Sequence, residues 1–128
     1  MKAITVMSAL AQPTRLAVFS LLARAGVEGM TAGELAERTG TPANTMSSHL
    51  TILSQAGLAT SRRAGRNIFS RAVPEAIRQL AVFLIKDCCD GCAEVCGHLQ
   101  DDLNECQRGR ERRKAGRTTV VSGKTDPS

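Results

Sequence analysis

The chain has 128 residues, which is enough for one domain with a single hydrophobic core. Hydrophobic residues make up 42% and charged residues 23% of it, as in ordinary globular proteins, whereas aromatic residues make up only 2%. So few aromatic rings argue against a stacking platform for RNA or single strands, and against a β-sandwich. No apolar run approaches the ~20 residues of a membrane span, so we expect no membrane partner.

The net charge of +5 is unevenly distributed. Residues 38–74 contain five arginines and no acidic residue, residues 75–106 contain seven acidic and two basic residues, and residues 107–128 are again mostly basic. A stretch without acidic residues is a candidate nucleic-acid surface. Scattered, solvated arginines are the alternative, and a fold that gathers them would decide between the two.

Three helices are predicted in the first part of the chain. Residues 1–11 show a helical apolar pattern, and a second helix begins at Pro13 and ends at Gly26. Thr31 and Glu34 have the spacing of a capping box at the start of a short third helix. The apolar stripe of the second helix is wide, so we expect it to be well buried; its members are Leu16, Val18, Phe19, Leu21 and Leu22.

A fourth helix follows after a tight turn that contains Gly40. Thr41 is its predicted cap, Pro42 suits its first turn, and we expect it to end near Gln55. Two short helices joined by a tight turn with a glycine are typical of a helix-turn-helix.

Two β-prone segments follow the fourth helix. Residues 58–63 and 66–71 are separated by Ala64 and Gly65, which predicts a hairpin. A hairpin directly after a helix-turn-helix makes a winged helix. We therefore expect a mainly α fold with a small β-hairpin.

The fourth helix has two contrasting faces. At 100° per residue, Met46, Leu50 and Leu53 form one inward stripe, whereas the opposite face is uncharged and rich in small hydrogen-bonding side chains. Such a face suits the major groove of duplex DNA, and the first turns should penetrate deepest. The hairpin tip could straddle the backbone or enter a minor groove. The expected DNA-binding residues are Pro42, Asn44, Thr45, Ser47, Ser48 and His49 on the helix and Arg62, Arg63 and Arg66 on the hairpin.

His49 lies at the edge of the inward stripe. A packed histidine or a phosphate contact is a more ordinary interpretation of that position than a metal ligand.

The C-terminal part begins with a helix from Pro74 that has more apolar surface than one face requires. Such a helix near a chain end usually meets a partner subunit, and burial within the monomer is the alternative. From residue 107 onward the polar, highly charged sequence predicts disorder. We therefore expect a DNA-binding and dimerisation domain with a thiol site over residues 1–98, and an acidic-then-basic extension over residues 99–128.

All five cysteines lie between positions 88 and 106, whereas a disulfide scaffold would spread them along the chain. The N-terminus is similar to a short signal peptide, but its apolar part is barely long enough and continues into an amphipathic stretch. We therefore expect a cytoplasmic protein with reduced thiols. Clustered thiols in that compartment predict metal or redox chemistry.

Three segments carry a family resemblance. LAQPTRL at residues 10–16, PANTMSSHL at residues 42–50 and RRAGR at residues 62–66 resemble the second helix, the recognition helix and the wing of the ArsR/SmtB repressors. The resemblance covers roughly residues 3–98. It implies a winged helix-turn-helix homodimer that pairs through its first helix and the helix at residues 74–87. It also implies that the dimer represses its operon and leaves double-stranded operator DNA when a toxic metal or metalloid binds.

The segment DCCDGCAEVC at residues 87–96 is similar to the C-terminal thiol motif of an arsenite-sensing branch of that family. Cys88, Cys89 and Cys96 match the motif, whereas Cys92 is a departure from it, so the three binding sulfurs are not fixed. The resemblance implies trivalent arsenic as inducer, with antimony as a second candidate and no organic cofactor.

The thiol spacing can also be considered without the resemblance. On a continuous helix Cys89, Cys92 and Cys96 share one face, and Cys88 points about 100° away from Cys89. All four converge only if the helix unwinds near Gly91. Three thiolates suit trivalent arsenic or antimony, whereas four suit tetrahedral zinc or cadmium.

Three alternatives remain beside an arsenic sensor. The first is a redox switch of the same fold, in which Cys88 and Cys96 become oxidised as a pair instead of binding an ion. The second is a structural zinc cluster with constitutive DNA binding. The third is a thiol reductase that uses Cys89 and Cys92, but the sequence lacks the βαβ pattern of such enzymes, so we expect no enzyme. Cys106 is expected to be a free thiol, and His98 a surface residue.

Overall fold

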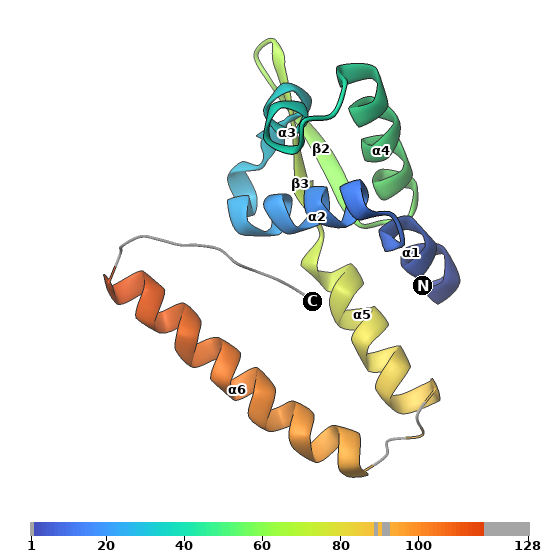
Figure 1. Cartoon of the computed structure of the whole chain (residues 1–128), viewed down its shortest axis with the longest axis vertical. Coiled ribbons are helices and arrows are strands. Elements are labelled where there is room, and N and C mark those ends of the chain that lie inside the picture. Colours follow the sequence, from blue (N-terminus) through green and yellow to red (C-terminus); the bar gives the residue numbers. More distant parts are fainter. Residues whose placement is uncertain (1, 89, 91–92, 117–128) are drawn as a thin grey trace. The chain divides into compact units, whose positions relative to one another are not determined.

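The computed structural model describes residues 2–88, 90 and 93–116 (Figure 1). The chain divides into two compact units, Met1–Leu84 and Ile85–Ser128. This division lies earlier in the chain than the boundary at residue 98 expected from the sequence. It places the cysteine segment in the second unit, with the C-terminal helix.

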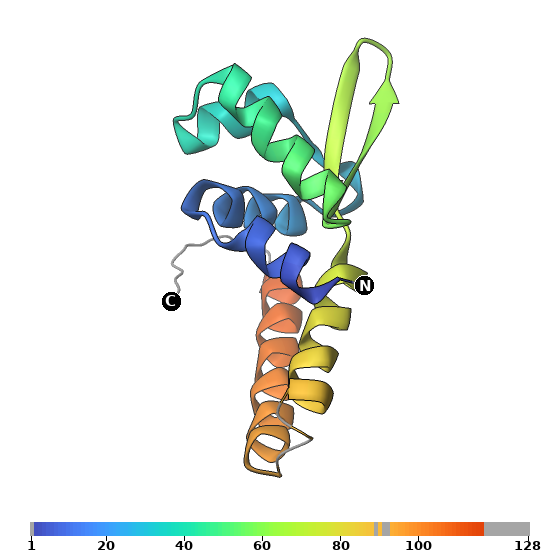
Figure 2. The same cartoon turned by 90° about the vertical axis from the view of Figure 1, so that its right-hand side faces the viewer.

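The first unit is a set of five helices with a small sheet (Figures 1 and 2). Two short helices, α3 and α4, form the helix-turn-helix, and the β2–β3 hairpin extends beyond the helices. The elements in chain order are α1 (Ala3–Leu10), α2 (Pro13–Ala25), a 3₁₀ turn (Gly26–Glu28), β1 (Met30–Thr31), α3 (Ala32–Thr39), α4 (Ala43–Gln55), β2 (Ala59–Ala64), β3 (Asn67–Ala72) and α5 (Pro74–Phe83).

The hydrophobic core draws on all five helices of the first unit and on β2. Apolar area removed from water stabilises such a core by about 25 cal/mol for each Å². The core residues are Val6, Ala9, Val18, Phe19, Leu22, Leu35, Met46, Leu53, Leu58, Ala59, Ala76 and Leu80. The stripe predicted for α2 is therefore confirmed at three positions, but Leu16 is 51% exposed and lies outside the core.

Side-chain caps begin two of the helices. The Gln12 side chain accepts a hydrogen bond of 2.8 Å from the backbone N–H of Arg15, and Pro13 occupies the first turn of α2. The predicted capping box of α3 is confirmed, because Thr31 and Glu34 each accept a hydrogen bond from the other's backbone N–H.

The predicted cap of α4 is wrong. Pro42 is the N-cap residue of α4, and the helix begins at Ala43. The Thr41 hydroxyl instead lies 2.9 Å from the hydroxyl of Thr39, within the turn that joins α3 to α4.

The sheet has three antiparallel strands in the order β1-β3-β2. The hairpin was predicted, but its turn consists of Gly65 and Arg66 instead of Ala64 and Gly65, because Ala64 pairs with Asn67. Gly65 has a φ of 65°, a conformation that a two-residue hairpin turn needs and glycine adopts readily. The third strand, β1, has only two residues, which is too short for an alternating pattern to predict.

Gly29 allows the chain before β1 to approach β3 closely. Its φ is 72°, and a Cβ atom at this position would overlap the carbonyl oxygen of Ser70. Ser70 pairs with Met30 and is the buried polar residue of the described core. A side chain at position 29 would therefore push β1 away from β3.

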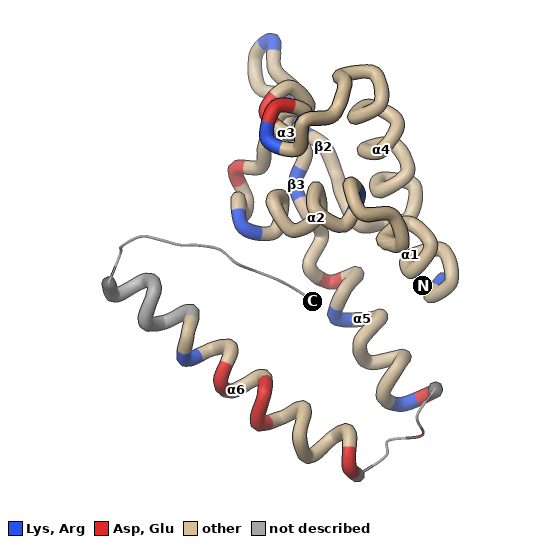
Figure 3. Tube along the Cα trace, in the orientation of Figure 1, with Lys and Arg blue, Asp and Glu red and all other residues tan. Residues whose placement is uncertain are grey.

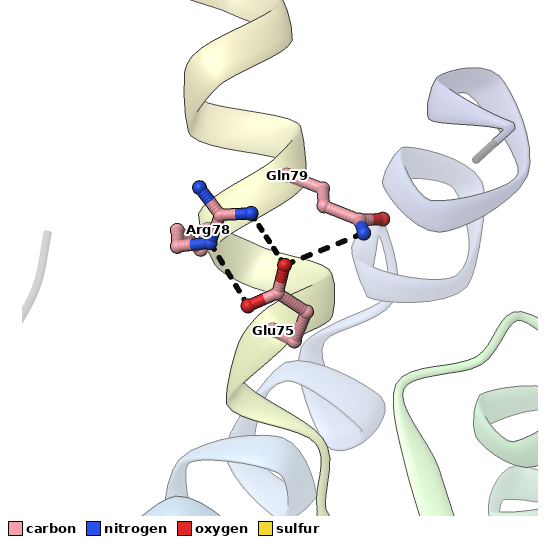
Figure 4. A network of polar contacts seen from close by, with 3 residues as sticks. All are labelled: Glu75, Arg78 and Gln79. Atoms are coloured by element: carbon pink, nitrogen blue, oxygen red, sulfur yellow. Dashed lines mark hydrogen bonds and ion pairs between the residues drawn. The ribbon is translucent and has the colours of Figure 1, made fainter.

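Surface contacts support the start of α5, which begins at Pro74 as predicted (Figure 4). Arg78 donates two hydrogen bonds to the Glu75 carboxylate, and the Gln79 amide lies 3.4 Å from it. The hydrogen bonds from Arg78 lower the pKa of the Glu75 carboxyl below its ordinary value, and the same contact raises the pKa of Arg78. Both side chains are exposed, so solvent screens the pair and its effect on stability is small.

A π-helical turn, Leu84–Cys88, spans the division between the units, and the second unit continues with α6, Ala93–Gly116. Asp90, between them, has a φ of 54°, which a right-handed helix does not contain. The disorder expected from residue 107 onward does not hold for residues 107–116, which belong to α6. Residues 117–128 lie outside the described residues.

Within the part of the chain that the structure describes, no single helix has the length and apolar character to cross a membrane. α1 and the Pro13–Glu28 segment meet these criteria only as a pair, bent by 100°.

The close approach at Gly29 predicts unequal costs for two alanine substitutions. Gly29→Ala should lower the free energy of unfolding by roughly 1–3 kcal/mol, because both the positive φ and the overlap with Ser70 are unfavourable. Gly57→Ala is the matched control, since Gly57 has a φ of 81° but no atom within 4 Å of a new Cβ. Urea unfolding measures both. Equal losses would contradict the role assigned to the β3 contact.

Candidate nucleic-acid interface and thiol segment

α4 presents an uncharged face to solvent, because its apolar stripe fixes the opposite side in the core. Met46 and Leu53 are completely buried and Leu50 is half-buried. Figure 3 shows the whole of α4 without a charged residue. Five of the helix residues expected to contact DNA are exposed, namely Pro42, Asn44, Thr45, Ser47 and Ser48. Thr51 and Gln55, farther along α4, are exposed as well.

Hydrogen bonds within α4 already engage part of three of these polar side chains. The Ser48 and Thr51 hydroxyls donate to the carbonyls of Asn44 and Ser47, at 3.4 and 3.0 Å. The Asn44 side-chain oxygen accepts from the backbone N–H of Thr45 at 2.9 Å. The Asn44 amide nitrogen therefore keeps two donors, and the hydroxyl oxygens keep acceptor lone pairs. This set can pair with base edges or with phosphate.

The wing adds positive charge beside this face. Figure 3 shows basic residues at the tip of the β2–β3 hairpin. Arg63, Arg66 and Arg71 are exposed, and no hydrogen bond to their side chains is found within the described residues. Guanidinium groups placed this way can contact phosphates or enter a narrow minor groove.

Arg62 differs from the other wing arginines because it is held within the protein. Its guanidinium carbon lies 5.2 Å from the centre of the Phe69 ring, and its nitrogen donates a 3.1 Å hydrogen bond to the carbonyl of Glu28. Phe69 is the cross-strand partner of Arg62, which places the two side chains on one face of the sheet. Arg62 thus attaches the wing to the turn after α2, and its exposed guanidinium keeps further donors.

Sequence reasoning missed the contact that His49 makes. The ring is half-buried, and its Nδ1 atom lies 3.5 Å from a guanidinium nitrogen of Arg15, on α2. The interpretation of His49 as a packed histidine agrees with this position. No local pattern could have revealed it, because 34 residues separate the two positions.

The thiol segment interrupts the C-terminal helices. Cys88 ends the π-helical turn and Cys96 is an exposed free thiol in the first turns of α6. Cys88 and Cys96 therefore do not belong to one continuous helix. Cys89, Cys92 and Gly91 lie outside the described residues. Cys106, expected to be free, is an exposed free thiol on α6.

The donor set fits a soft ion in its chemistry. Four sulfurs within nine residues give enough thiolates for a trivalent or tetrahedral soft metal. Among the residues that the structure places, no three His, Cys, Asp or Glu side chains lie close enough to hold a metal. A site here therefore depends on the residues between Cys88 and Ala93.

Comparisons with known proteins point to one family. Residues 10–62 match the model of a helix-turn-helix domain. The crystal structure of a "possible transcriptional regulator for arsenical resistance" is 31% identical, has a TM-score of 0.55, and matches over 62% of this chain and 79% of its own. The winged helix-turn-helix domain of Mb0332 from Mycobacterium bovis, a "possible ArsR-family transcriptional regulator", is 30% identical and has a TM-score of 0.54. The match covers 64% of this chain and 74% of that one. The chain belongs to the ArsR family of transcriptional regulators.

Two further relatives extend the comparison. An ArsR-like transcriptional regulator from Rhodococcus sp. RHA1 is 25% identical, with a TM-score of 0.59, over 89% of this chain and 92% of that one. The transcriptional regulator KmtR of Mycobacterium tuberculosis is 40% identical over 79 residues, which are 62% of this chain and 58% of KmtR. The match therefore spans little more than half the length of KmtR.

The winged helix-turn-helix fold predicted from the sequence of this ArsR-family chain is confirmed.

The chain also has exposed apolar side chains that lie outside its own core. Ile4 on α1 is 76% exposed, Leu16 on α2 is 51% exposed, and Val82 and Leu84 at the end of α5 are 40% and 37% exposed.

The anchoring of the wing predicts a difference between neighbouring arginines. Arg62→Leu should speed amide hydrogen exchange in β2 and β3, because it removes the contacts to Glu28 and Phe69, and the ring contact alone contributes about 0.5–1 kcal/mol. Arg63→Leu, on the opposite face of the same strand, is the control and should leave exchange unchanged. Identical exchange rates in the two variants would show that the contacts of Arg62 do not stabilise the wing.

Proposed function

We propose that this ArsR-family protein is a homodimeric repressor of an arsenic-resistance operon. It binds double-stranded operator DNA through α4 and the wing, and it leaves the operator when trivalent arsenic binds the C-terminal thiols. The observation that carries the proposal is the uncharged, hydrogen-bonding face of α4 beside the basic wing. The family and the clustered cysteines supply the rest of the argument.

DNA recognition divides between the two elements. The first turns of α4 enter the major groove, where the Asn44 amide suits adenine and the hydroxyls of Ser47 and Ser48 suit bases or phosphates. Arg63 and Arg66 contact the backbone or the adjacent minor groove. We call the uncharged, solvent-facing side of α4 its reading face. Pro42 and Thr45 flank this face, and His49 supplies a donor at its edge.

Dimerisation uses the apolar surface that the monomer leaves exposed on α1 and at the end of α5. Ile4, Val82 and Leu84 are large side chains in contact with water in the single chain. A two-fold pairing through these helices removes them from water and sets the two recognition helices one turn of DNA apart. The homodimeric state of the Mycobacterium bovis relative supports this arrangement.

Cys88, Cys89 and Cys96 are the proposed ligands, with Cys92 as an alternative third sulfur. Trivalent arsenic accepts three thiolates, and antimony shares this chemistry. The chain's part is to bring sulfurs from both sides of the helix break together. Because Cys88 ends the turn that follows α5, gathering the sulfurs changes the direction in which the chain leaves the proposed dimer helix.

Release of DNA requires that the inducer bind the DNA-free form more tightly than the bound form. A coupling free energy of about 3 kcal/mol between inducer binding and DNA binding lowers operator affinity about 150-fold. The protein is proposed to act in the cytoplasm, without enzymatic activity or an organic cofactor.

Two candidates of the same fold remain. A thiol redox switch would use Cys88 and Cys96 as an oxidisable pair, and a zinc or cadmium sensor would use all four sulfurs. Arsenite added under strong reductant separates the redox switch from the arsenic sensor, and zinc or cadmium added in the same assay tests the third candidate.

Removing one wing arginine should weaken DNA binding without changing its sequence preference. The logarithm of affinity falls with the logarithm of salt concentration, and Arg66→Ala should make this fall less steep by about 1, because one phosphate contact is lost. Asn44→Ala should instead reduce the preference for operator over random duplex by about 1–3 kcal/mol. Fluorescence anisotropy at several salt concentrations measures both. An unchanged salt slope in Arg66→Ala would remove the wing from the interface.

The thiol assignment predicts which serine variants remain bound to DNA. Cys88→Ser, Cys89→Ser and Cys96→Ser should each bind operator normally but keep binding it with saturating arsenite under reductant, because a ligand is missing. Cys106→Ser is the control and should release DNA like the unmodified chain.

The Cys92→Ser variant decides the composition of the site. Normal release supports the three-sulfur set of Cys88, Cys89 and Cys96. Loss of release at position 92 with normal release at position 88 would show that the ligand set is wrong.

A further inference from the structure

Arg15 joins three helices through one side chain. Its Nε atom donates a 2.6 Å hydrogen bond to the carbonyl of Ala9, and one terminal nitrogen lies 3.5 Å from the carbonyl of Ser8. Its other terminal nitrogen lies 3.5 Å from Nδ1 of His49. The guanidinium thus extends from α2 to the end of α1 and to α4, the proposed recognition helix.

The contacts to α1 act as a C-terminal cap. The last carbonyls of a helix lack partners within the helix, and the last turn of α1 has no basic residue of its own. A cation that donates to these carbonyls stabilises them and interacts favourably with the helix dipole. Arg15 is therefore fixed on one side by α1, and one of its other guanidinium nitrogens lies beside the ring of His49.

The chemistry of the two side chains favours one tautomer of the ring. A guanidinium has five donors and no acceptor, so an imidazole nitrogen that pairs with it must accept the hydrogen bond. The position of Nδ1 beside the guanidinium of Arg15 therefore matches a neutral ring whose proton lies on Nε2. Nε2–H is then the one donor that His49 can offer to DNA.

α1 and α4 also lie side by side beyond this contact. A shallow groove between them is lined by Ile4, Thr5, Ser8 and Ala9 from α1, and by Ile52, Gln55 and Ala56 at the end of α4. Nothing polar in the described residues other than Arg15 connects the carbonyl end of α1 to a side chain of α4. The guanidinium of Arg15 is therefore the polar connection through which a shift of α1 can reach His49 on α4.

We propose that Arg15 is a positioning residue that holds His49 as the neutral Nε2–H tautomer and couples α1 to the recognition helix. The inference rests on the proposed function, because it assigns His49 to the DNA surface and α1 to the dimer. A movement of α1 at the dimer interface then changes the donor that α4 offers to DNA. In this arrangement Arg15 acts through His49 and need not touch the nucleic acid.

The test measures the tautomer directly. His98→Asn leaves His49 as the only histidine, and long-range ¹H–¹⁵N spectra of its ring distinguish the two neutral tautomers. In this background we expect the Nε2–H form. Arg15→Met should give a mixture of tautomers and bind operator about tenfold more weakly, as expected for loss of one hydrogen bond to a charged group. Arg24→Met, which removes an exposed arginine from the last turn of the same helix, is the matched control and should change neither property.

Two further variants and outcomes complete the test. Arg15→Lys keeps a positive donor without an acceptor and should retain the Nε2–H form, which also covers the case that Arg15→Met does not fold. A Nδ1–H ring in the parent protein, or an unchanged tautomer in folded Arg15→Met, would overturn the proposal. If the parent protein shows the expected tautomer but does not bind duplex DNA, the proposed function fails while the Arg15–His49 contact stands.

Discussion

The burial of one face of α4 is the constraint on which the rest of this structure depends. Met46 and Leu53 are completely enclosed by the other helices and by β2, so α4 cannot rotate about its axis without exposing them. Burying each such side chain stabilises the folded state by about 1.5–3 kcal/mol. That packing determines which residues face solvent, and it leaves a face without charge. A solvent-facing surface of this kind has little reason to lack charges unless it meets a partner with its own hydrogen-bonding edges.

The second determinant is the attachment of the wing. The hairpin alone is a two-stranded ribbon of marginal stability, and β1 adds only two residues to it. The close approach at Gly29 and the contacts of Arg62 connect it to the turn after α2. These contacts divide the arginines of the wing, because Arg62 serves the fold while Arg63 and Arg66 remain available for a ligand.

The two compact units divide the proposed activity between them. The first contains the reading face, the wing and the exposed apolar side chains of α1 and α5, whereas the second contains the cysteines. The join between them is a π-helical turn, a form that often marks functional positions in helices.

The sequence by itself determined the five helices of the first unit, the capping box of α3, the hairpin and the two faces of α4. Each of these depends on spacing or on turn chemistry within a few residues, which the order of amino acids displays directly. It also contained the cysteine cluster, because an excess of thiols within a short segment is a local signal.

Only the tertiary structure decided features that join distant parts of the chain. Leu16 belongs to the apolar stripe of α2 that predicts burial, yet it is exposed, because the neighbouring helices cover a narrower face of α2 than the stripe. The pairing of Arg15 with His49, and of Arg62 with the carbonyl of Glu28, each spans 34 residues. Such contacts have no signature in the sequence, since they depend on how the helices cross and on the register of the strands. The extension of α6 over residues 107–116 likewise contradicts a composition that favours solvation.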